Sequence, residues 1–314
     1  MASEQLKGHL AIAAAYTIFG LNVVLCKDIA NSEAVAPHVL FTFRAIGASA
    51  LFWLLSLFMP KEKVEKGDMW RIALASFLGL FLTQMTFLVG ITMVTPIDSA
   101  ILGTLGPVFT MFFAYFFVGE PITGKKAGGV AVALAGVIFL IVNTVHAGGA
   151  TTTPLGVVML LLNSLTFSMY LGIFRPLISK YSAVTFMKWA FLYSLLMSLP
   201  FSFKGMLTMD YSAIPVNVRW EIAYLIVFAT FIAYYLIPFG QKHIRPTLVS
   251  MYNYLSPVIA TIVSIWTGMD HLTWQKVIAA AAIVGGVILV SKSRAANPGG
   301  SADTQGAGLR KPGK

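Results

Sequence analysis

Residues 101–120 read ILGTLGPVFTMFFAYFFVGE, and residues 251–270 read MYNYLSPVIATIVSIWTGMD. Both stretches are apolar, and each carries a proline near its middle, Pro107 in the first and Pro257 in the second. A shift of 150 residues along the chain places one proline on the other. The two stretches therefore indicate an internal repeat.

The agreement continues without a gap on both sides of the prolines. The matched pairs include Gly90 and Gly240, Pro96 and Pro246, Gln84 and Tyr234, Glu120 and Asp270, Lys126 and Lys276, and Gly136 and Gly286. Nearer the starts of the two halves, a shift of 148 places Phe19 on Phe167 and Lys27 on Arg175. The pattern predicts two units of five helices, and because five is odd, the second unit is inverted in the membrane relative to the first.

The composition is that of a membrane protein. Of the 314 residues, 57% are hydrophobic and 11% are charged, and the mean hydropathy is +0.80. A soluble domain does not have this composition, whereas a bilayer core of about 30 Å is crossed by about 20 apolar residues in a helix. Cys26 is the single cysteine, which excludes an internal disulfide. The formal net charge of +10 lies mostly in loops and indicates orientation rather than a nucleic-acid partner.

Ten apolar runs are bounded by proline, glycine or charged residues, which predicts an all-α protein with ten transmembrane helices. The runs cover 8–26, 36–59, 69–91, 96–118, 127–145, 154–174, 183–203, 218–240, 246–268 and 274–291. With both termini in the cytoplasm, most of the 22 Lys and Arg residues fall in cytoplasmic segments. The positive-inside rule therefore predicts a multi-pass protein of the cytoplasmic (inner) membrane with the N- and C-termini inside.

This division gives four segments. We expect a cytoplasmic N-terminus at 1–7, a first five-helix repeat at 8–145, a second at 154–291 and a disordered cytoplasmic tail at 295–314, which is rich in glycine and polar residues. The indole rings of Trp70, Trp220 and Trp274, each at the start of a run, are interpreted as anchors at the membrane interface.

The repeat and its motifs resemble the EamA-like transporters of the drug/metabolite transporter superfamily. The resemblance covers about residues 8–291 and rests on the Pro-centred helix of each half, on the turn Gly119-Glu120-Pro121, on Phe19-Gly20 with Asn22 and Lys27, and on Arg44. The second half departs from the pattern at Met269-Asp270 and at Ser168. The resemblance implies ten helices and export or exchange of small metabolites, commonly amino acids or related compounds, without naming the substrate.

Charged residues at membrane depth are few. Arg44 and Asp98 both enter from the outer face, and a charge at this depth costs at least about 2.5 kcal/mol without a partner or water. We expect these two residues to form an ion pair. The alternatives for Arg44 are contact with the substrate or an outward-reaching side chain. Lys188 is expected to reach the cytoplasmic face, and Lys27 and Arg175 to anchor helix ends.

A central cavity is predicted between the two halves. Pro107 and Pro257 lie about 16 Å along their helices, near the midplane, and each lacks the N–H that would bond the carbonyl four residues earlier, at Gly103 or Asn253. The predicted hinges are these prolines, unless they are packing kinks. The predicted substrate-binding residues, unless they only join helices, are Asn22, Arg44, Thr83, Gln84, Asn163, Tyr170, Tyr234, Tyr252 and Asn253.

The favoured function is a carrier that exports or exchanges a small amphipathic metabolite by alternating access. The alternatives are an intramembrane enzyme and a membrane scaffold or receptor. The spans lack H-E-x-x-H, paired aspartates and a Ser/His constellation, so no catalytic residue, metal or cofactor is predicted. The glycines of the fifth and tenth helices are assigned to helix packing or to a homodimer contact. Asp98 is the one carboxylate considered for proton coupling.

Overall fold

The structure is a computed structural model that describes residues 2–106, 108–109, 113, 123–146, 152–243, 252 and 255–292. Every element within these ranges is helical. The α-helices are α1 (Ala2–Ser32), α2 (Pro37–Ser56), α3 (Lys66–Ser76), α4 (Thr83–Thr92), α5 (Pro96–Gly103), α7 (Gly124–His146), α8 (Pro154–Ile173), α9 (Arg175–Lys180), α10 (Ala183–Thr208), α11 (Val216–Tyr224), α12 (Ala233–His243), α14 (Leu255–Trp266) and α15 (Trp274–Lys292). Two π-helical segments, η1 (Phe77–Leu82) and η2 (Leu225–Ile232), join α3 to α4 and α11 to α12.

Five helices in the described part of the chain are long and apolar enough to cross a bilayer. They are Gln5–Ser32, Pro37–Ser56, Lys66–Thr92, Ala183–Thr208 and Val216–Ile237. Shorter apolar helices follow at Pro154–Tyr170, Leu255–Trp266 and Trp274–Leu289. The chain is therefore a helical membrane protein that crosses the bilayer several times.

Local sequence explains where several helices begin. A proline occupies the first turn of α2, α5 and α8, where its missing N–H is not needed. The hydroxyls of Thr95 and Thr153 accept hydrogen bonds from the first turns of α5 and α8, and Ser182 does the same for α10.

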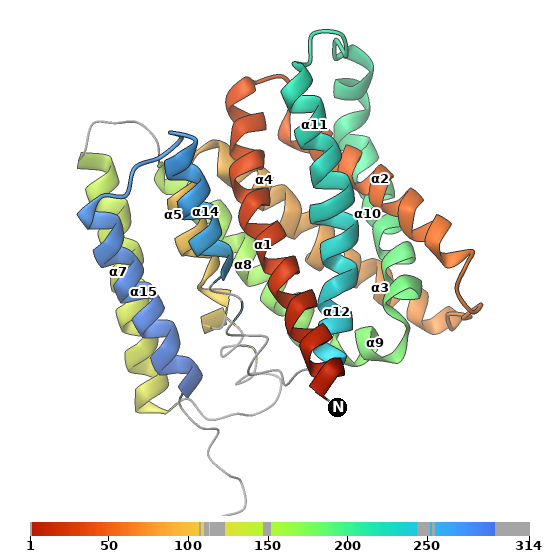
Figure 1. The fold of residues 1–314 in the computed structure, drawn as a ribbon, viewed down its shortest axis with the longest axis horizontal. Coiled ribbons are helices and arrows are strands. Elements are labelled where there is room, and N and C mark those ends of the chain that lie inside the picture. The colour runs from red at the N-terminus through yellow and green to blue at the C-terminus, as the bar shows by residue number, and fades with distance from the viewer. Residues whose placement is uncertain are drawn as a thin grey trace, which may run out of the picture.

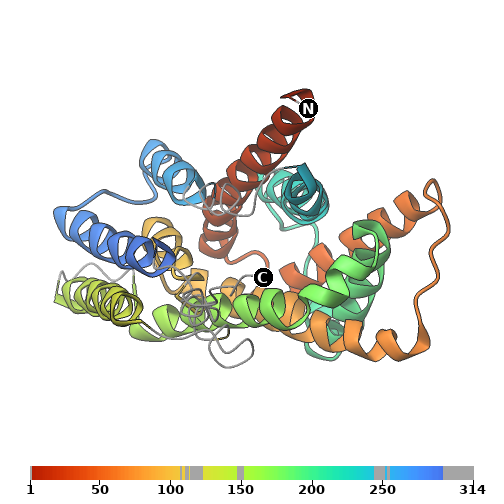
Figure 2. The same ribbon diagram turned by 90° about the horizontal axis from the view of Figure 1, so that it is seen from below.

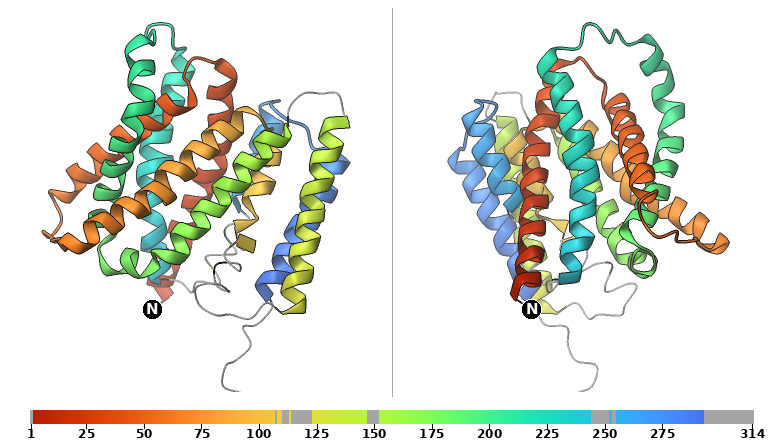
Figure 3. Two further views of the ribbon diagram at one scale, coloured as in Figure 1. Left: turned by 180° about the vertical axis from the view of Figure 1, so that it is seen from behind. Right: turned by 45° about the vertical axis from the view of Figure 1, so that its right-hand side comes forward.

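The helices form a bundle in which α7 and α15 lie side by side at one edge (Figures 1 and 2). Helix α2 packs against α10, α1 against α12 and α14, and α8 against α4 and α5. We call the end with the connections 33–36, 93–95, 209–215 and 267–273 the far end. The opposite, N-terminal end carries the start of α1 and the connections 57–65 and 174–182 (Figures 1 and 3).

Close packing of α7 on α15 depends on two glycines. Gly136 lies against Ile283 on α15, and Gly286 lies against Ala133 on α7, with no room for a Cβ atom at either glycine. Gly128 and Gly285 have open space at the corresponding position. Two of the predicted packing glycines, Gly136 and Gly286, therefore pack one helix of the chain against another.

The two π segments are a feature that the sequence does not signal. At each one a threonine hydroxyl donates to the carbonyl five residues earlier at 2.7 Å: Thr83, which directly follows η1, to Leu78, and Thr230, within η2, to Leu225. These bonds satisfy carbonyls that the wider turn exposes, which a chain in lipid requires.

The predicted proline breaks are described in part. Helix α5 ends at Gly103, and the N–H groups of Thr104 and Leu105 then bond carbonyls three residues back, as in a tighter turn. Pro257 lies in the described helix α14, near residues 253 and 254, which the structure does not describe. Pro107, Asn253, the turn at 119–121, most of 246–254 and the tail at 295–314 lie outside the described residues.

The structure also differs from the predicted helix ends. Helix α1 continues to Ser32, beyond the expected end at residue 26, because the ammonium of Lys27 finds the carbonyls of Ile91 and Thr92 at 3.1 and 3.2 Å. Trp70, Trp220 and Trp274 are 64%, 73% and 64% exposed, and their position at the membrane interface stays a prediction.

Candidate functional site

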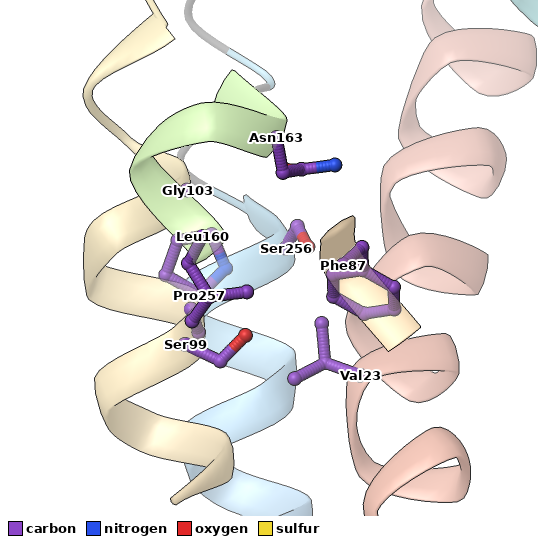
Figure 4. Close-up of a pocket in the computed structure, with 9 residues that line it drawn as sticks. Val23, Phe87, Ser99, Gly103, Leu160, Asn163, Ser256 and Pro257 are labelled. Carbon is purple, nitrogen blue, oxygen red and sulfur yellow. The ribbon is translucent and has the colours of Figure 1, made fainter. Parts of the chain in front are cut away.

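A cavity of about 100 Å³ lies among α1, α4, α5, α8 and α14 (Figure 4). The described residues that line it are Val23, Phe87, Ser99, Ala100, Gly103, Leu160, Asn163, Ser256 and Pro257. This volume is about that of three water molecules, well below the roughly 300 Å³ of an ordinary ligand pocket. The cavity is thus smaller than an ordinary small-molecule site.

The lining combines apolar side chains with a few uncharged polar groups. Two hydroxyls, of Ser99 and Ser256, and the amide of Asn163 accompany the ring of Phe87 (Figure 4). None of the nine described lining residues carries a charge. Such a surface offers apolar contact and a few neutral hydrogen-bonding groups.

Two predicted residues line this cavity. Asn163 does so from α8 while its amide donates to the carbonyl of Thr83 at 2.8 Å. Pro257 does so from α14, near Gly103, whose carbonyl the sequence predicts to be released by Pro107. The prediction thus identified one polar side chain and one proline of the lining.

The predicted pair Gln84 and Tyr234 forms a direct contact elsewhere in the interior. The Gln84 amide donates to the Tyr234 hydroxyl at 3.0 Å, joining α4 to α12. The rings of Phe19 and Phe191 meet Tyr234 edge-on, with centroids at 6.1 and 5.6 Å. These rings enclose the hydrogen bond.

The other predicted residues are spread through the helix interfaces. Asn22 accepts a weak bond from the Cys26 thiol at 3.7 Å, and the hydroxyls of Thr83 and Thr166 lie 2.9 Å apart. Tyr170 is buried with its ring on Gly79 of η1. Near the N-terminal end, the Tyr252 hydroxyl is 3.0 Å from Nδ1 of His9, and Asn253 lies outside the described residues.

The predicted ion pair between Arg44 and Asp98 is wrong. Arg44 is 2% exposed and donates from Nε to the Thr230 hydroxyl at 2.9 Å, with Nη1 3.9 Å from the Cys26 sulfur. Helix α2 packs on α10 and η2, whereas α5 packs on α14 and α8. Similar depth along two helices does not make them neighbours, and sequence alone gives no lateral position.

Asp98 instead belongs to a group at the far end that we call the far-end cluster: Asp98, Asp270 and Lys276 with the hydroxyls of Thr95 and Thr152. The Lys276 ammonium lies 2.6 Å from Asp270 Oδ1, 3.6 Å from Asp98 Oδ1 and 3.1 Å from the Thr95 hydroxyl. The Thr152 hydroxyl donates to Asp98 Oδ2. The cluster joins α5, the connection before α15, and α15 itself.

The far-end cluster lies directly beside the cavity along α5. Asp98 is fully buried, and the next residue, Ser99, lines the cavity. The backbone N–H of Ile97 donates to Asp270 Oδ2 at 3.3 Å, so the start of α5 is bound to the connection that precedes α15. The cluster therefore links the start of α5 to α15 and to the connections before α8 and α15.

A second group of charges joins the halves of the chain at the N-terminal end. Lys180 pairs with Glu65 at 2.8 Å and with Asp68 at 2.7 Å, and the Tyr181 hydroxyl donates to Asp68 at 2.8 Å. Hydrogen bonds to Asp68 and Glu65 raise the pKa of Lys180 above its usual value.

Glu62 completes this N-terminal-end network. Its carboxylate accepts the backbone N–H of Ser182, the cap of α10, at 3.0 Å. Partial burial would raise the pKa of Glu62, but hydrogen bonds from Ser182 and Thr185, with the nearby charge of Lys188, outweigh it and hold that pKa below its usual value. The Lys188 ammonium lies 5.0 Å from the Trp53 ring centroid, a cation–π contact at the end predicted for it.

Sequence reasoning missed several important residues. Ser99, Ser256 and Phe87 line the cavity, and Lys276 organises the far-end cluster. Serine is common in membrane helices, so neither serine stands out by type. Lys276 is at the start of the tenth apolar run, where a loop cation is expected, although its match with Lys126 in the repeat could have marked it.

Comparison with known proteins agrees with this architecture. A model of the EamA-like transporter family matches the chain twice, at residues 6–142 and 154–292. The chain belongs to the EamA-like transporter family. The resemblance inferred from the repeat and its prolines is thereby confirmed.

Relatives of this EamA-like transporter include bacterial and plant proteins. An uncharacterized transporter of Bacillus subtilis, YetK, is 25% identical over 298 residues, which cover 92% of this chain and 88% of YetK. The WAT1-related protein At2g40900 of Arabidopsis thaliana is 25% identical over 317 residues, covering 92% and 77% of the two chains. A solved crystal structure shares the fold, with a TM-score of 0.59 at 20% identity over 93% of this chain and 97% of that one.

Proposed function

We propose that this EamA-like transporter is a carrier of the cytoplasmic membrane that exports or exchanges a small metabolite, an amino acid or a related amphipathic compound, by alternating access. The proposed scaffold has ten transmembrane helices in two inverted five-helix repeats, 8–145 and 154–291. The proposed orientation puts both termini in the cytoplasm, so that the far end faces outward.

The observation that carries this proposal is that contacts recur when the two halves are exchanged. Gly90 lies against Leu160, and the shifts of 150 and 148 convert this pair into Gly240 and Ile12, which also lie together. The Gly136–Ile283 contact likewise becomes Gly286 against Ala133. Contacts that exchange in this way support an approximate two-fold axis between the halves.

The helix neighbours follow the same rule. Helix α1 packs on α12, and α8, its match in the second half, packs on α4, the match of α12 under the shift of 150. Gly20 of α1 lies against Ser256, while Ser168 of α8 donates to the Gly106 carbonyl at 3.1 Å. An inverted repeat lets each half adopt the other's conformation, which opens the site to alternate sides.

The cavity is the proposed substrate site. It lies between helices of both halves, and its uncharged lining suits an amphipathic solute. Because it holds only about three waters, we infer that it widens when the carrier opens. Of the predicted residues, Asn163 is proposed to touch substrate first. Arg44, Gln84 and Tyr234 remain proposed for the wider surroundings, with Pro107 and Pro257 as proposed hinges.

Transport by purified protein in liposomes tests the proposal. A mixture of radiolabelled amino acids and related compounds should enter protein-containing vesicles faster than empty ones. Asn163→Ala and Ser256→Ala should lower the rate of the transported compound. The matched control is Asn143→Ala, because the Asn143 amide on α7 donates to the carbonyl of Phe139 in its own helix and does not line the cavity as described. Absence of uptake for every compound would contradict the proposed carrier function. Equal rates in all variants would contradict the proposed site.

An enzyme or a scaffold remains the alternative, and the same experiment separates them. An enzyme would convert a compound without moving it, and a scaffold would do neither. Neither alternative accounts for contacts that exchange between halves.

A further inference from the structure

Asp98 is the least compensated charge in the far-end cluster. Its side chain is fully buried, and Oδ1 accepts no hydrogen bond from any residue that the structure describes. The closest cation, the Lys276 ammonium, stands 3.6 Å from that oxygen, beyond hydrogen-bond distance. A buried carboxylate with an unsatisfied oxygen is costly when it is ionised.

The Lys276 ammonium lies closer to Asp270 than to Asp98. Lys276 Nζ is 2.6 Å from Asp270 Oδ1, and the backbone N–H groups of Ile97 and His271 donate to the same carboxylate at 3.3 and 2.7 Å. Lys27, near the far end of α1, donates instead to the carbonyls of Ile91 and Thr92 at the end of α4. Asp270 is therefore the carboxylate that this group stabilises as an anion.

The charged and titratable groups near Asp98 come from α15, from the connection before α15 and from the far end of α1. Helix α15 supplies Lys276, the connection before it supplies Asp270 and His271, and α1 supplies Lys27 and Asp28 near its far end. Helices α4, α8 and α14 carry no Asp, Glu, Lys, Arg or His within their described ranges. Two carboxylates thus share the one ammonium of the cluster.

We propose that Asp98 is the proton-binding residue of an outward gate: the closed far-end cluster holds a proton on Asp98, and outward opening releases it. In the closed form a proton on Oδ1 removes the poorly compensated charge. When α5 separates from α15, water reaches Asp98, and the proton passes from Oδ1 to the solution at the far end. Closure takes up a proton there in the reverse step. This inference rests on the proposed carrier function and supplies its link to protons.

The direction of the pH effect on gate opening follows from the linkage between proton binding and conformation. Because the closed form binds the proton more tightly than the open form, low pH favours closure and rising pH favours opening. One proton changes the ratio of open to closed by at most about tenfold per pH unit. The reverse sign belongs to a gate held shut by an Asp98–Lys276 ion pair, which protonation would open.

Cysteine labelling tests the gate without knowledge of the substrate. In a Cys26→Ser background, Ser99→Cys places the only thiol in the cavity, one residue from Asp98. Intact cells are treated with a membrane-impermeant maleimide between about pH 5 and pH 9, a range that spans the titration of buried carboxylates. Each rate is divided by that of Ala213→Cys in the exposed 209–215 connection, which corrects for thiol ionisation.

We expect the corrected rate to rise several-fold with pH when Asp98 is present, and to be low and independent of pH in Asp98→Asn. Asp210→Asn, an exposed aspartate of the same end, should keep the rise. A flat profile with Asp98 intact, a rate that falls with pH, or an unchanged profile in Asp98→Asn overturns the proposal. If Asp98→Asn does not reach the membrane, the profile of the unmodified cluster still decides.

Failure of this inference is distinct from failure of the carrier proposal. If solute moves in liposomes but the labelling rate does not depend on pH, the protein is a carrier and the proposed proton site is wrong. If the labelling rate depends on pH but no solute moves, the gate is present and the proposed transport function is wrong.

Discussion

The Gln84 amide donates a hydrogen bond to the Tyr234 hydroxyl at 3.0 Å, and the two residues stand 150 positions apart in the chain. That separation equals the shift that superposes the two halves. A residue that contacts its own counterpart lies beside the axis that relates the halves. The pair therefore marks the proposed two-fold axis in the interior, between α4 and α12.

Loss of this bond should lower stability by a measurable amount. Tyr234→Phe and Gln84→Leu each remove one partner from a partly buried bond, so each should lower the free energy of unfolding by about 1 kcal/mol. In the double variant the losses should not add, because the same bond is lost once. Thermal unfolding midpoints in detergent measure this, with Tyr235→Phe next door as the control. Additive losses would show that the bond contributes nothing.

The glycines of α7 and α15 should respond in opposite ways to one methyl group. In Gly286→Ala the new Cβ would meet the Gly129 carbonyl and the Ala133 backbone, so we expect a loss of about 1–3 kcal/mol from overpacking. Gly285→Ala, where nothing lies within 4 Å, should be neutral or gain up to about 1 kcal/mol from helix propensity. The same unfolding midpoints apply, and equal effects at both positions would contradict the packing described for α7 and α15.

Acid should weaken the network at the N-terminal end through Glu62. The folded protein holds the pKa of Glu62 below its usual value of 4.5, so its contribution to stability is present above that pH and is lost as pH falls through the lowered pKa. Glu62→Gln should therefore flatten the fall of the unfolding midpoint below about pH 4.5. Glu33→Gln, in the 33–36 connection, should leave the fall unchanged. An identical slope in both variants would rule out this role of Glu62.

Reporter fusions should establish the orientation. Alkaline phosphatase is active only outside the cytoplasm, so a fusion at the C-terminus should be inactive and one placed after residue 213 should be active. The reason is the concentration of loop Lys and Arg on the side of the termini. The reverse pair of activities would invert the protein and turn the far end toward the cytoplasm.

The sequence was sufficient for the class of protein, for the repeat and for the family, because apolar run length and repeat spacing are properties of the chain alone. It also identified Asn163 and Pro257 as lining residues. It failed for Arg44 and Asp98, whose depth could be read from helix rise but whose lateral neighbours depend on helix packing. It also gave no indication of the cavity serines or of the π segments, which arise from tertiary contacts rather than from residue type.

The π segments η1 and η2 end two residues before Gln84 and Tyr234, respectively. Each contains hydrogen bonds to the carbonyl five residues earlier, so its turn holds one more residue than a turn of a regular α-helix. Deletion of one residue inside either segment would restore ordinary α-helical bonding and leave the flanking turns in nearly the same orientation, because a π turn accommodates one extra residue. Each π turn therefore marks the place, just before Gln84 or Tyr234, where a transmembrane helix accommodates an extra residue.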